Sequence, residues 1–269
     1  MRKAVASIYN QTKKPFEIII IDQSEKKHTS KQVLEKYWGC PDIRVVILHR
    51  PNISGLTAAK NLGLKYANGD IIQFLDDDSE VEKSFISCLN KCFVREEIDG
   101  AAGKIIEMKK RIHPLAKYFQ KIFYLGQFRL IREEWYHENR PKEKLTNSLP
   151  GVAAYRKEIF KRYLFDEKLN GACIGEDLDF SFRASKEHKF ILTSKLRSYH
   201  NPDPSERLNS ENQSYQKIRF FQYHFKKNID PTSLNKALYI WLNIGFLMHY
   251  IISWQPRKAA GFFRAWLEK

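Results

Sequence analysis

The feature that most constrains this chain is a short apolar run that ends in three consecutive aspartates. Residues 71–75 (IIQFL) follow the turn sequence Asn68-Gly69-Asp70 and lead directly into Asp76, Asp77 and Asp78. A short apolar run bounded by turn residues predicts a buried strand. Three carboxylates at its end repel one another, and a divalent cation such as Mg²⁺ or Mn²⁺ would relieve that repulsion. An exposed, Asp-rich turn is the alternative, because aspartate is common in turns.

The first half of the chain alternates between strand-like and helix-like segments. Short apolar runs predict strands, and longer stretches with helical spacing predict helices. The expected strands are residues 16–21 (FEIIII), 43–48 (IRVVIL) and 71–75, and the expected helices are residues 29–38, 55–66 and 81–94. This order predicts an α/β fold in which crossover helices flank a parallel sheet. Ligands bind beyond the carboxyl ends of such strands, where Asp22 and the three aspartates both fall.

The second half has one irregular stretch and three more ordered segments. Residues 104–148 are basic and aromatic and predict an irregular insertion near the site, residues 150–155 predict a small-residue strand, and residues 190–199 predict a strand ending at His200. Between them, residues 171–185 (GACIGEDLDFSFRAS) predict an amphipathic helix that begins with Glu176 and Asp177. The acidic start of this helix and His200 each have a purely structural alternative. Acidic residues at a helix start stabilise the helix dipole, and a lone His before Asn-Pro is commonly a loop residue.

The composition fits a globular protein with one large α/β domain or a domain with an appendage. The 269 residues are 43% hydrophobic and 29% charged, which excludes a disordered chain. Four cysteines without a CxxC pair indicate free thiols in a reducing compartment and not a zinc site. The net charge of +15 suits a phosphate-bearing substrate, an anionic membrane face or nucleic acid, but the charge is spread along the chain and no nucleic-acid-binding motif accompanies it.

The C-terminal tail contains a long uncharged stretch. Residues 237–254 (ALYIWLNIGFLMHYIISW) have no Asp, Glu, Lys or Arg, and three of the five tryptophans, Trp241, Trp254 and Trp266, lie in the tail. A membrane span needs roughly 20 apolar residues, so the stretch is borderline for crossing a bilayer. Aromatic residues flanked by cations are typical of segments that lie at a membrane interface. Three alternatives stay open: the tail spans the membrane, lies on it, or packs as a buried helix.

Taken in order, five segments resemble an inverting family 2 glycosyltransferase with the GT-A fold. They are PFEIIIIDQS, GLTAAKNLGLKYANGDIIQFLDDDS, PGVAAY, GEDLDFSFRA and a lone His, and together they run over about residues 4–200. The resemblance implies an α/β, GT-A-type, Rossmann-like fold: a mixed, mostly parallel sheet flanked by helices, with a helical C-terminal tail. The implied organisation is a glycosyltransferase domain over residues 1–205 and a helical, membrane-associated segment over residues 206–269.

The resemblance also implies roles for individual residues. Asp177 would be the catalytic base beside Glu176, and Asp76 and Asp78 would form an Asp-x-Asp motif that, with His200, holds Mn²⁺ or Mg²⁺. The residues implied in binding the nucleotide-sugar are Asp22, which would hydrogen-bond the base, together with Lys60, Asn61, Asp76 and Asp77. Lys60 stands where many members carry arginine. It would steady the diphosphate as a point charge, without the bidentate fork of an arginine.

The expected function is transfer of a sugar from a nucleotide-diphosphate sugar to a hydroxyl acceptor with inversion. This chemistry needs a carboxylate base for the acceptor proton and a metal to neutralise the departing diphosphate. We expect the enzyme to act in cell-surface polysaccharide or lipid-linked glycan synthesis, in the cytoplasm at the inner face of the membrane. The alternatives are an inactive glycosyltransferase-like binding domain and a sugar nucleotidyltransferase. The latter calls for a Gly-rich, Lys- or Arg-bearing loop after the first strand, and none is present.

One departure from the family pattern concerns the beginning of the chain as given. Family members place one more apolar strand before the helix that matches residues 4–11, and that strand lies between those matching residues 16–21 and 71–75. Loss of a central strand exposes unpaired backbone on both of its neighbours. The resemblance therefore leads us to expect an N-terminally truncated domain that is poorly soluble or inactive alone, unless another segment fills the gap.

Overall fold

The computed structural model describes residues 1–25, 32–33, 35, 43–107, 119, 121–128, 143–169, 175–200 and 208–268. The expected helix over residues 29–38 lies outside the described residues apart from three positions, as does most of the stretch 104–148. The chain divides into two compact units, one formed by residues 1–109 and 138–203 and the other by residues 110–137 and 204–269. The first carries the α/β fold, and the second is helical.

The α/β unit opens with a helix that packs on a small sheet. Helix α1 (Arg2–Tyr9) precedes strands β1 (Glu17–Asp22) and β2 (Arg44–His49), which pair in parallel with Ile19 opposite Val46. Val5 and Tyr9 of α1 are buried against Ile18 and Ile43. Helix α3 (Leu56–Tyr66) follows β2 and contacts β1. In the described part of the chain no ladder joins β1 to the strand after α3.

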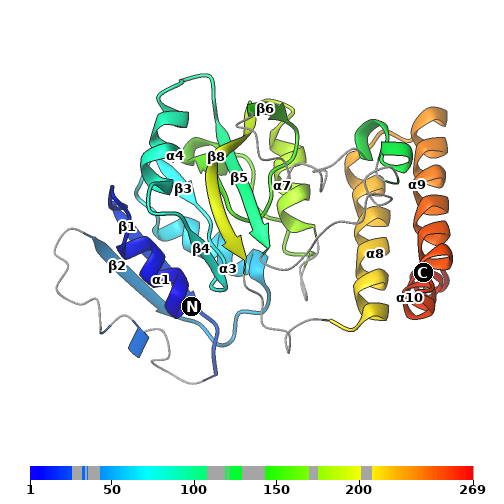
Figure 1. Cartoon of the computed structure of the whole chain (residues 1–269), viewed down its shortest axis with the longest axis horizontal. Helices are drawn as coiled ribbons and strands as arrows, with labels where there is room; N and C mark the ends of the chain where they lie inside the picture. Colours follow the sequence, from blue (N-terminus) through cyan, green and yellow to red (C-terminus); the bar gives the residue numbers. More distant parts are fainter. Residues whose placement is uncertain are drawn as a thin grey trace. The chain divides into compact units, whose positions relative to one another are not determined.

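A six-stranded mixed sheet forms the centre of this unit (Figure 1). Its strands are β3 (Ile71–Gln73), β4 (Ser79–Val81), β5 (Gly100–Glu107), β6 (Glu143–Thr146), β7 (Ala153–Arg156) and β8 (Phe190–His200). The order is β3-β7-β5-β8-β4, and β6 pairs with β8. Strands β5 and β8 run parallel, whereas the β3–β7, β5–β7, β4–β8 and β6–β8 pairs are antiparallel. The carboxyl end of β3 therefore leads into Asp76, and the end of β8 presents His200.

A break in register divides β8 into two halves. Ala102 pairs with Leu192, but Lys104 already pairs with Arg197, so β8 bulges between these two pairs. Gly103 lies at the break, and a Cβ atom there would lie 1.9 Å from the carbonyl oxygen of Leu196. Only glycine allows the two backbones to approach this closely.

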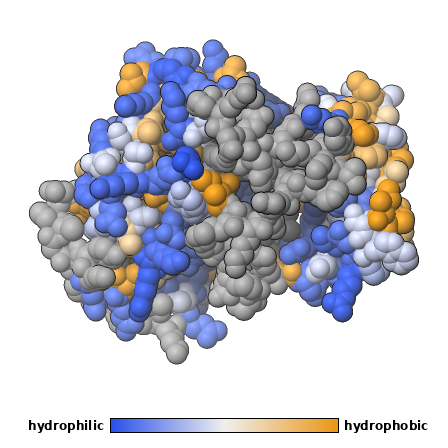
Figure 2. All heavy atoms as spheres, in the orientation of Figure 1, coloured by the Kyte–Doolittle hydropathy of each residue, from blue (hydrophilic) through white to orange (hydrophobic). Residues whose placement is uncertain are grey.

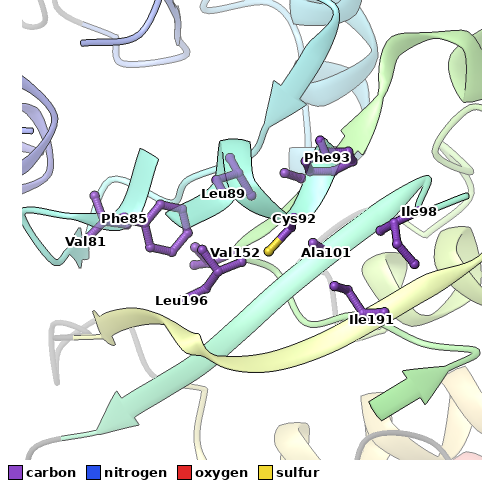
Figure 3. Close-up of a cluster of buried hydrophobic side chains, with 11 residues drawn as sticks. Val81, Phe85, Leu89, Cys92, Phe93, Ile98, Ala101, Val152, Ile191 and Leu196 are labelled. Carbon is purple, nitrogen blue, oxygen red and sulfur yellow. The ribbon is translucent and has the colours of Figure 1, made fainter. Parts of the chain in front are cut away.

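Helices cover the sheet and close its core. Helix α4 (Phe85–Phe93) packs on β8, and Phe85, Leu89 and Cys92 meet Ala101 and Leu196 in a buried cluster (Figure 3). The 3₁₀ turn η3 (Lys157–Lys161) follows β7, and α7 (Glu176–Ala184) precedes β8. Ile71, Leu75 and Leu196 belong to this cluster or pack against it, so the core supports the segments that lead to Asp76 and His200.

The helical unit consists of α8 (Ser210–Asn228), α9 (Ser233–Ile252), α10 (Pro256–Leu267) and the short turn η2 (Gly126–Phe128). Gly261 of α10 lies against α8, where a Cβ atom would be 2.1 Å from the carbonyl oxygen of Glu211. One face of α9, including Leu242 and Phe246, is buried. No helix in the described ranges is both long and apolar enough to cross a membrane.

The expected α/β, GT-A-type mixed sheet with flanking helices and a helical C-terminal segment is confirmed. One expected element is partly wrong. The helix expected over residues 81–94 begins only at Phe85, because Ser79 to Val81 pair with the end of β8 as strand β4. The expected boundary near residue 205 stays a prediction, and in the structure residues 110–137 group with the C-terminal helices.

Candidate active site

Helix α3 carries two polar side chains, Lys60 and Asn61, into the interior of the α/β unit. Both residues are buried, together with the smaller Thr57 and Ala59 of the same helix. A buried charge or amide is costly unless it is paired, so the partners of these two side chains identify the site.

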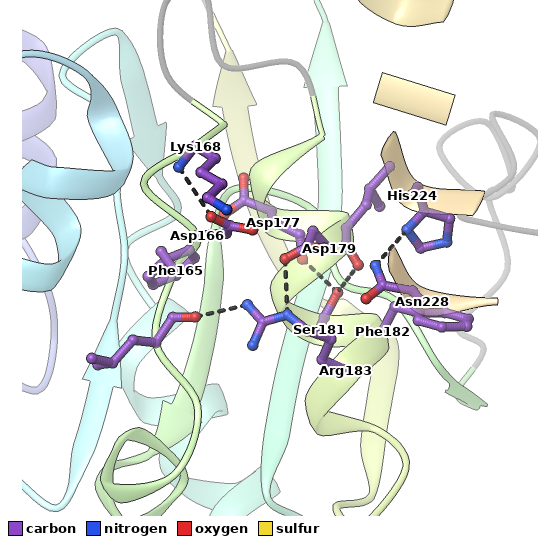
Figure 4. Close-up of polar contacts among 12 residues, drawn as sticks. Phe165, Asp166, Lys168, Asp177, Asp179, Ser181, Phe182, Arg183, His224 and Asn228 are labelled. Carbon is purple, nitrogen blue, oxygen red and sulfur yellow. Dashed lines mark hydrogen bonds and ion pairs between the residues drawn. The ribbon is translucent and has the colours of Figure 1, made fainter. Parts of the chain in front are cut away.

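The acidic residues 176 and 177 form the first turn of α7. Gly175 precedes the helix at a φ of 94°, a left-handed conformation that favours glycine. Ser181 Oγ donates a hydrogen bond to the carbonyl oxygen of Asp177 and accepts one from the backbone N–H of Leu149. Arg183 donates to the buried Asp179 at 2.9 Å (Figure 4). These contacts hold the start of α7 in place against the loop before β7.

Lys60 forms a buried ion cluster with the first turn of α7. Its Nζ lies 2.6 Å from Asp177 Oδ1 and 3.2 Å from Glu176 Oε1. Burial opposes the charge of Lys60, but attraction to the two carboxylates raises its pKa. Burial also raises the pKa of Glu176 to about 8, and repulsion from Asp177 adds to this effect. Asp177 is therefore the closer partner of the ammonium, and Glu176 favours its protonated form near neutral pH.

Asp76 and Asp177 both lie beside Gly151. A Cβ atom at Gly151 would be 3.0 Å from Asp177 Oδ2 and 3.4 Å from Asp76 Oδ2. Burial raises the pKa of Asp76, and the carboxylates of Asp177 and Asp78 push it in the same direction. The end of β3, the loop before β7 and the start of α7 thus bring two carboxylates to one place.

Asp78 and His200 form a second polar pair at the end of the sheet. Strand β4 pairs with β8 so that Ser79 lies opposite His200. His200 Nε2 is 3.0 Å from Asp78 Oδ2. The hydrogen bond with His200 lowers the pKa of Asp78. Antiparallel pairing of β4 with the second half of β8 therefore accounts for this contact.

Three other residues expected in the site have different surroundings. Asp77 is exposed, with 79% of its side chain accessible, and lies 3.6 Å from the amino group of Met1. Asp22 ends β1 and accepts hydrogen bonds from the N–H of Ser24 at 3.0 Å and from its hydroxyl. Asn61 donates to the carbonyl oxygen of Phe165 at 2.9 Å and accepts from the N–H of the same residue at 3.0 Å. Asn61 thus anchors the segment around residue 165.

Comparison with known proteins settles which family this arrangement belongs to. A sequence profile of Glycosyl transferase family 2 matches residues 1–164, which include α3 and the three aspartates. The chain belongs to glycosyltransferase family 2.

Two sequences and one solved structure are among the proteins that this chain resembles. The chain is 25% identical over 211 residues to Glycosyltransferase GlyA of Streptococcus pneumoniae, covering 74% of this chain and 28% of that protein. It is 35% identical over 89 residues to the GalNAc(5)-diNAcBac-PP-undecaprenol beta-1,3-glucosyltransferase of Campylobacter jejuni, covering 33% of this chain and 28% of that protein. The mannosyltransferase PcManGT of Pyrobaculum calidifontis, solved with GDP-Man and Mn²⁺, superposes with a TM-score of 0.60 at 15% identity, covering 98% of this chain and 70% of that one. The chain thus spans about a quarter to a third of the first curated relatives it matches.

The family raises the question of whether this glycosyltransferase can hold a divalent metal. Among the described residues no three His, Cys, Asp or Glu side chains converge closely enough to enclose an ion. Mg²⁺ and Mn²⁺ need no such enclosure, because they take one or two protein ligands and complete their shell with water and substrate phosphates. The Asp78–His200 pair, with the crowded carboxylate of Asp76 nearby, fits that requirement.

Several features of the site are not evident from the sequence. The position of Gly151 beside the carboxylates of Asp76 and Asp177 was not expected. The absence of a side chain at this residue is the only feature of the sequence that could have indicated it. The aromatic residues Phe74 and Phe165, which lie beside Lys60, read as ordinary core positions. The pairing of Lys60 with Asp177 joins residues 117 positions apart, and no local pattern indicates such a contact.

Proposed function

We propose that this family 2 enzyme transfers a sugar, with inversion, from a nucleotide-diphosphate sugar to a hydroxyl acceptor, and that Asp177 is the catalytic base. The observation that carries the proposal is the position of Asp177. It lies in a buried ion cluster, and its Oδ2 lies beside Gly151, as does Oδ2 of Asp76. A base must stand within hydrogen-bond reach of the proton it removes and must be ionised.

The two oxygens of Asp177 have separate tasks in this mechanism. Oδ1 accepts a hydrogen bond from Lys60, and that contact orients the carboxylate. Oδ2, beside Gly151, accepts the proton of the acceptor hydroxyl as its oxygen attacks the sugar carbon on the face opposite the leaving diphosphate. Glu176, which favours its protonated form, stays a neutral neighbour and does not compete for that proton.

The donor is held by the ends of the strands. Asp78 and His200 would hold Mn²⁺ or Mg²⁺ together with the donor phosphates, with Asp76 and Asp77 beside them. A bound metal would stabilise the negative charge that develops on the departing diphosphate. Asp22, at the end of β1, would bind the nucleotide base. Support for this donor class comes from the family and from a structural neighbour solved with a nucleotide-sugar and Mn²⁺.

A thermal-shift panel tests the donor and the metal together. UDP-, GDP- and dTDP-sugars, each with and without Mn²⁺, should raise the melting temperature only where the folded protein binds them. Asp78→Asn should abolish the metal-dependent shift without changing the melting temperature of the free protein by more than a few degrees. Asp70→Asn is the matched control, because Asp70 is an exposed carboxylate at the other end of β3. An undiminished shift in Asp78→Asn would exclude Asp78 as the main metal ligand.

We also propose that the enzyme works on a lipid-linked or polysaccharide acceptor at the cytoplasmic face of a membrane, and that α9 contacts the lipid. From residue 240 onward the exposed side of α9 is largely apolar, with exposed Ile240, Ile244, Met248, Ile251 and Ile252, and hydrophobic patches are visible over this helix in Figure 2. A helix facing water normally exposes polar residues there. Trp254 ends the face with 90% of its surface exposed and a φ of 48°.

The charges around this face favour an anionic lipid surface as its partner. Lys236 lies at the start of α9, and Arg257 and Lys258 follow Trp254. Between residues 208 and 268 eight Lys and Arg stand against three Asp and Glu. Tryptophan and flanking cations are the groups that settle at the boundary of headgroups and acyl chains.

Flotation with lipid vesicles tests this contact. The full chain should float with vesicles containing phosphatidylglycerol at low salt and less with neutral phosphatidylcholine vesicles. Ile251→Gln with Trp254→Ser should abolish flotation, whereas Val94→Gln, which changes an exposed apolar residue of the α/β unit, should not. Equal flotation of both variants, or none by the wild-type chain, would reject the lipid contact. Dimerisation through α9, detected by light scattering and lost in the double variant, would assign the face to a second copy.

A further inference from the structure

Lys60 has no free surface with which to meet a large substrate. Only 5% of its side chain is accessible, although a lysine on a helix is normally in water. Its ammonium lies 5.0 Å from the ring centre of Phe165 and 5.7 Å from that of Phe74. These aromatic faces attract the cation and close one side of it.

The open side of the ammonium faces carboxylates. Two of its three N–H groups are directed to Asp177 Oδ1 and Glu176 Oε1, and the charge of Asp76 also acts on it. The cluster thus contains one cation and three carboxyl groups, of which Glu176 favours its protonated form. Its members come from α3, from the segment after β3 and from α7, so Lys60 is the group that joins these elements at the site.

Phe165 is itself held by α3, one residue beyond Lys60. The Asn61 side chain donates to the Phe165 carbonyl and accepts from its N–H. Phe165 in turn stacks on Phe180 of α7 at a ring distance of 4.5 Å. One turn of α3 therefore fixes both the ammonium and the ring beside it, which leaves the lysine little freedom to swing toward a ligand.

We propose that Lys60 is a positioning residue for the catalytic base: its contact with Asp177 Oδ1 holds that carboxylate with Oδ2 turned toward the acceptor, and Lys60 makes no contact with the donor diphosphate. This inference rests on the proposed role of Asp177. It replaces the expectation, drawn from the arginine that stands at this position in many family members, that Lys60 binds the donor.

Removal of the Lys60 ammonium should affect turnover and not donor binding. Without the ammonium, Asp177 loses the 2.6 Å contact that fixes its Oδ1 and stands near Asp76 with no compensating charge. A carboxylate that rotates away from the acceptor cannot take the acceptor proton. The loss should therefore fall on turnover, because the proposed donor ligands at Asp22, Asp76 and Asp78 are unchanged.

The test compares Lys60→Met and Lys60→Arg with Lys65→Met, which removes an exposed lysine from the same helix. UDP affinity with Mn²⁺ is measured by calorimetry, and kcat is measured at saturating donor. In Lys60→Met we expect kcat to fall by roughly 10²–10⁴-fold, the usual effect of losing a positioned base, while the Kd for UDP changes less than about threefold. Lys60→Arg should recover part of kcat, because it restores the charge in a larger side chain.

The opposite pattern would overturn the proposal. A weaker Kd for UDP in Lys60→Met, with kcat unchanged at saturating donor, would show that Lys60 contacts the diphosphate. Absence of transfer by the wild-type chain with every donor would instead reject the proposed function.

Melting experiments test the ion cluster without any turnover. If Lys60 serves Asp177, the double variant Lys60→Met/Asp177→Asn should melt higher than Lys60→Met alone, because it removes the uncompensated charge. Additive losses would show that the pair is not coupled and would overturn the inference on structural grounds.

Discussion

Replacing Glu176 with glutamine should change how the stability of the α/β unit depends on pH. Burial raises the pKa of this side chain to about 8 from an ordinary value of 4.5. Between these two values the folded protein keeps a proton on Glu176 that the unfolded chain has released. Folding stability contributed by this group is therefore complete below about pH 4.5, falls as the pH rises, and is lost above about pH 8.

The size of the effect follows from the linkage between proton binding and folding. One proton bound by the folded state alone gives a slope of roughly 1.4 kcal/mol per pH unit. A glutamine side chain has nearly the shape of the protonated acid and does not titrate, so Glu176→Gln lacks this slope. From about pH 5.5 to 7.5 the stability of Glu176→Gln relative to the wild type should grow by roughly 2–3 kcal/mol.

The assay is urea denaturation of both proteins at several pH values in the presence of EDTA, followed by far-ultraviolet circular dichroism. Tryptophan fluorescence is a poor probe here, because three of the five tryptophans lie in or next to α9 and α10. Titration of all other groups cancels in the difference between the two proteins, except for the neighbours Lys60, Asp177 and Asp76. Parallel stability curves would refute the reasoning, since they would show that Glu176 is ionised in the folded protein at neutral pH.

Three further substitutions test the site and the sheet. Asp177→Asn should lower kcat by roughly 10²–10⁴-fold and leave the Kd for UDP nearly unchanged; an equal loss in Glu176→Gln, with none in Asp177→Asn, would transfer the base to Glu176. Gly151→Ala should lower kcat at least tenfold with a nearly unchanged melt, because its Cβ would lie 3.0 Å from Asp177 Oδ2; full activity would contradict this crowding. Gly103→Ala should destabilise the fold by roughly 1–3 kcal/mol or more, as overpacking does, since its Cβ would lie 1.9 Å from Leu196 O. Gly63→Ala is its control, because the nearest side-chain atom there is 3.7 Å away; similar urea midpoints for the two would refute the prediction.

Local patterns in the sequence were enough to place the elements that carry the site. Helix α3 was expected over residues 55–66 and is found at Leu56–Tyr66, and β8 was expected to end at His200 and does so. These elements have a clear apolar period and clear turn residues at their ends. The start of α4 was misplaced because residues 79–81 are fixed by pairing with β8, which is a long-range contact that helical periodicity cannot reveal.

The electrostatics of the site depend on contacts that local patterns do not encode. Glu176 and Asp177 read equally well as an ordinary acidic helix start, and only burial beside Lys60 distinguishes them. The expected role of Asn61 in binding the nucleotide-sugar stays a prediction, and no local pattern indicates that its amide also anchors the backbone of Phe165. Charge pairs form between elements far apart in the chain, so the residue types were predictable and their partners were not.

Because of the bulge in β8, the pairing register of one half of the strand does not determine the register of the other half. Before the break, Phe190, Ile191 and Leu192 are locked between β5 and β6, where a one-residue slip would turn apolar side chains out of the core. After the break, residues 197–200 follow β4 and the later part of β5, and they set the distance between His200 and Asp78. Residues gained or lost within positions 193–196 would therefore alter which side chain faces Asp78, while the part of the core formed by Phe190, Ile191 and Leu192 kept its register. In evolutionary terms, this segment allows the residue opposite Asp78 to change without redesign of the first half of the strand.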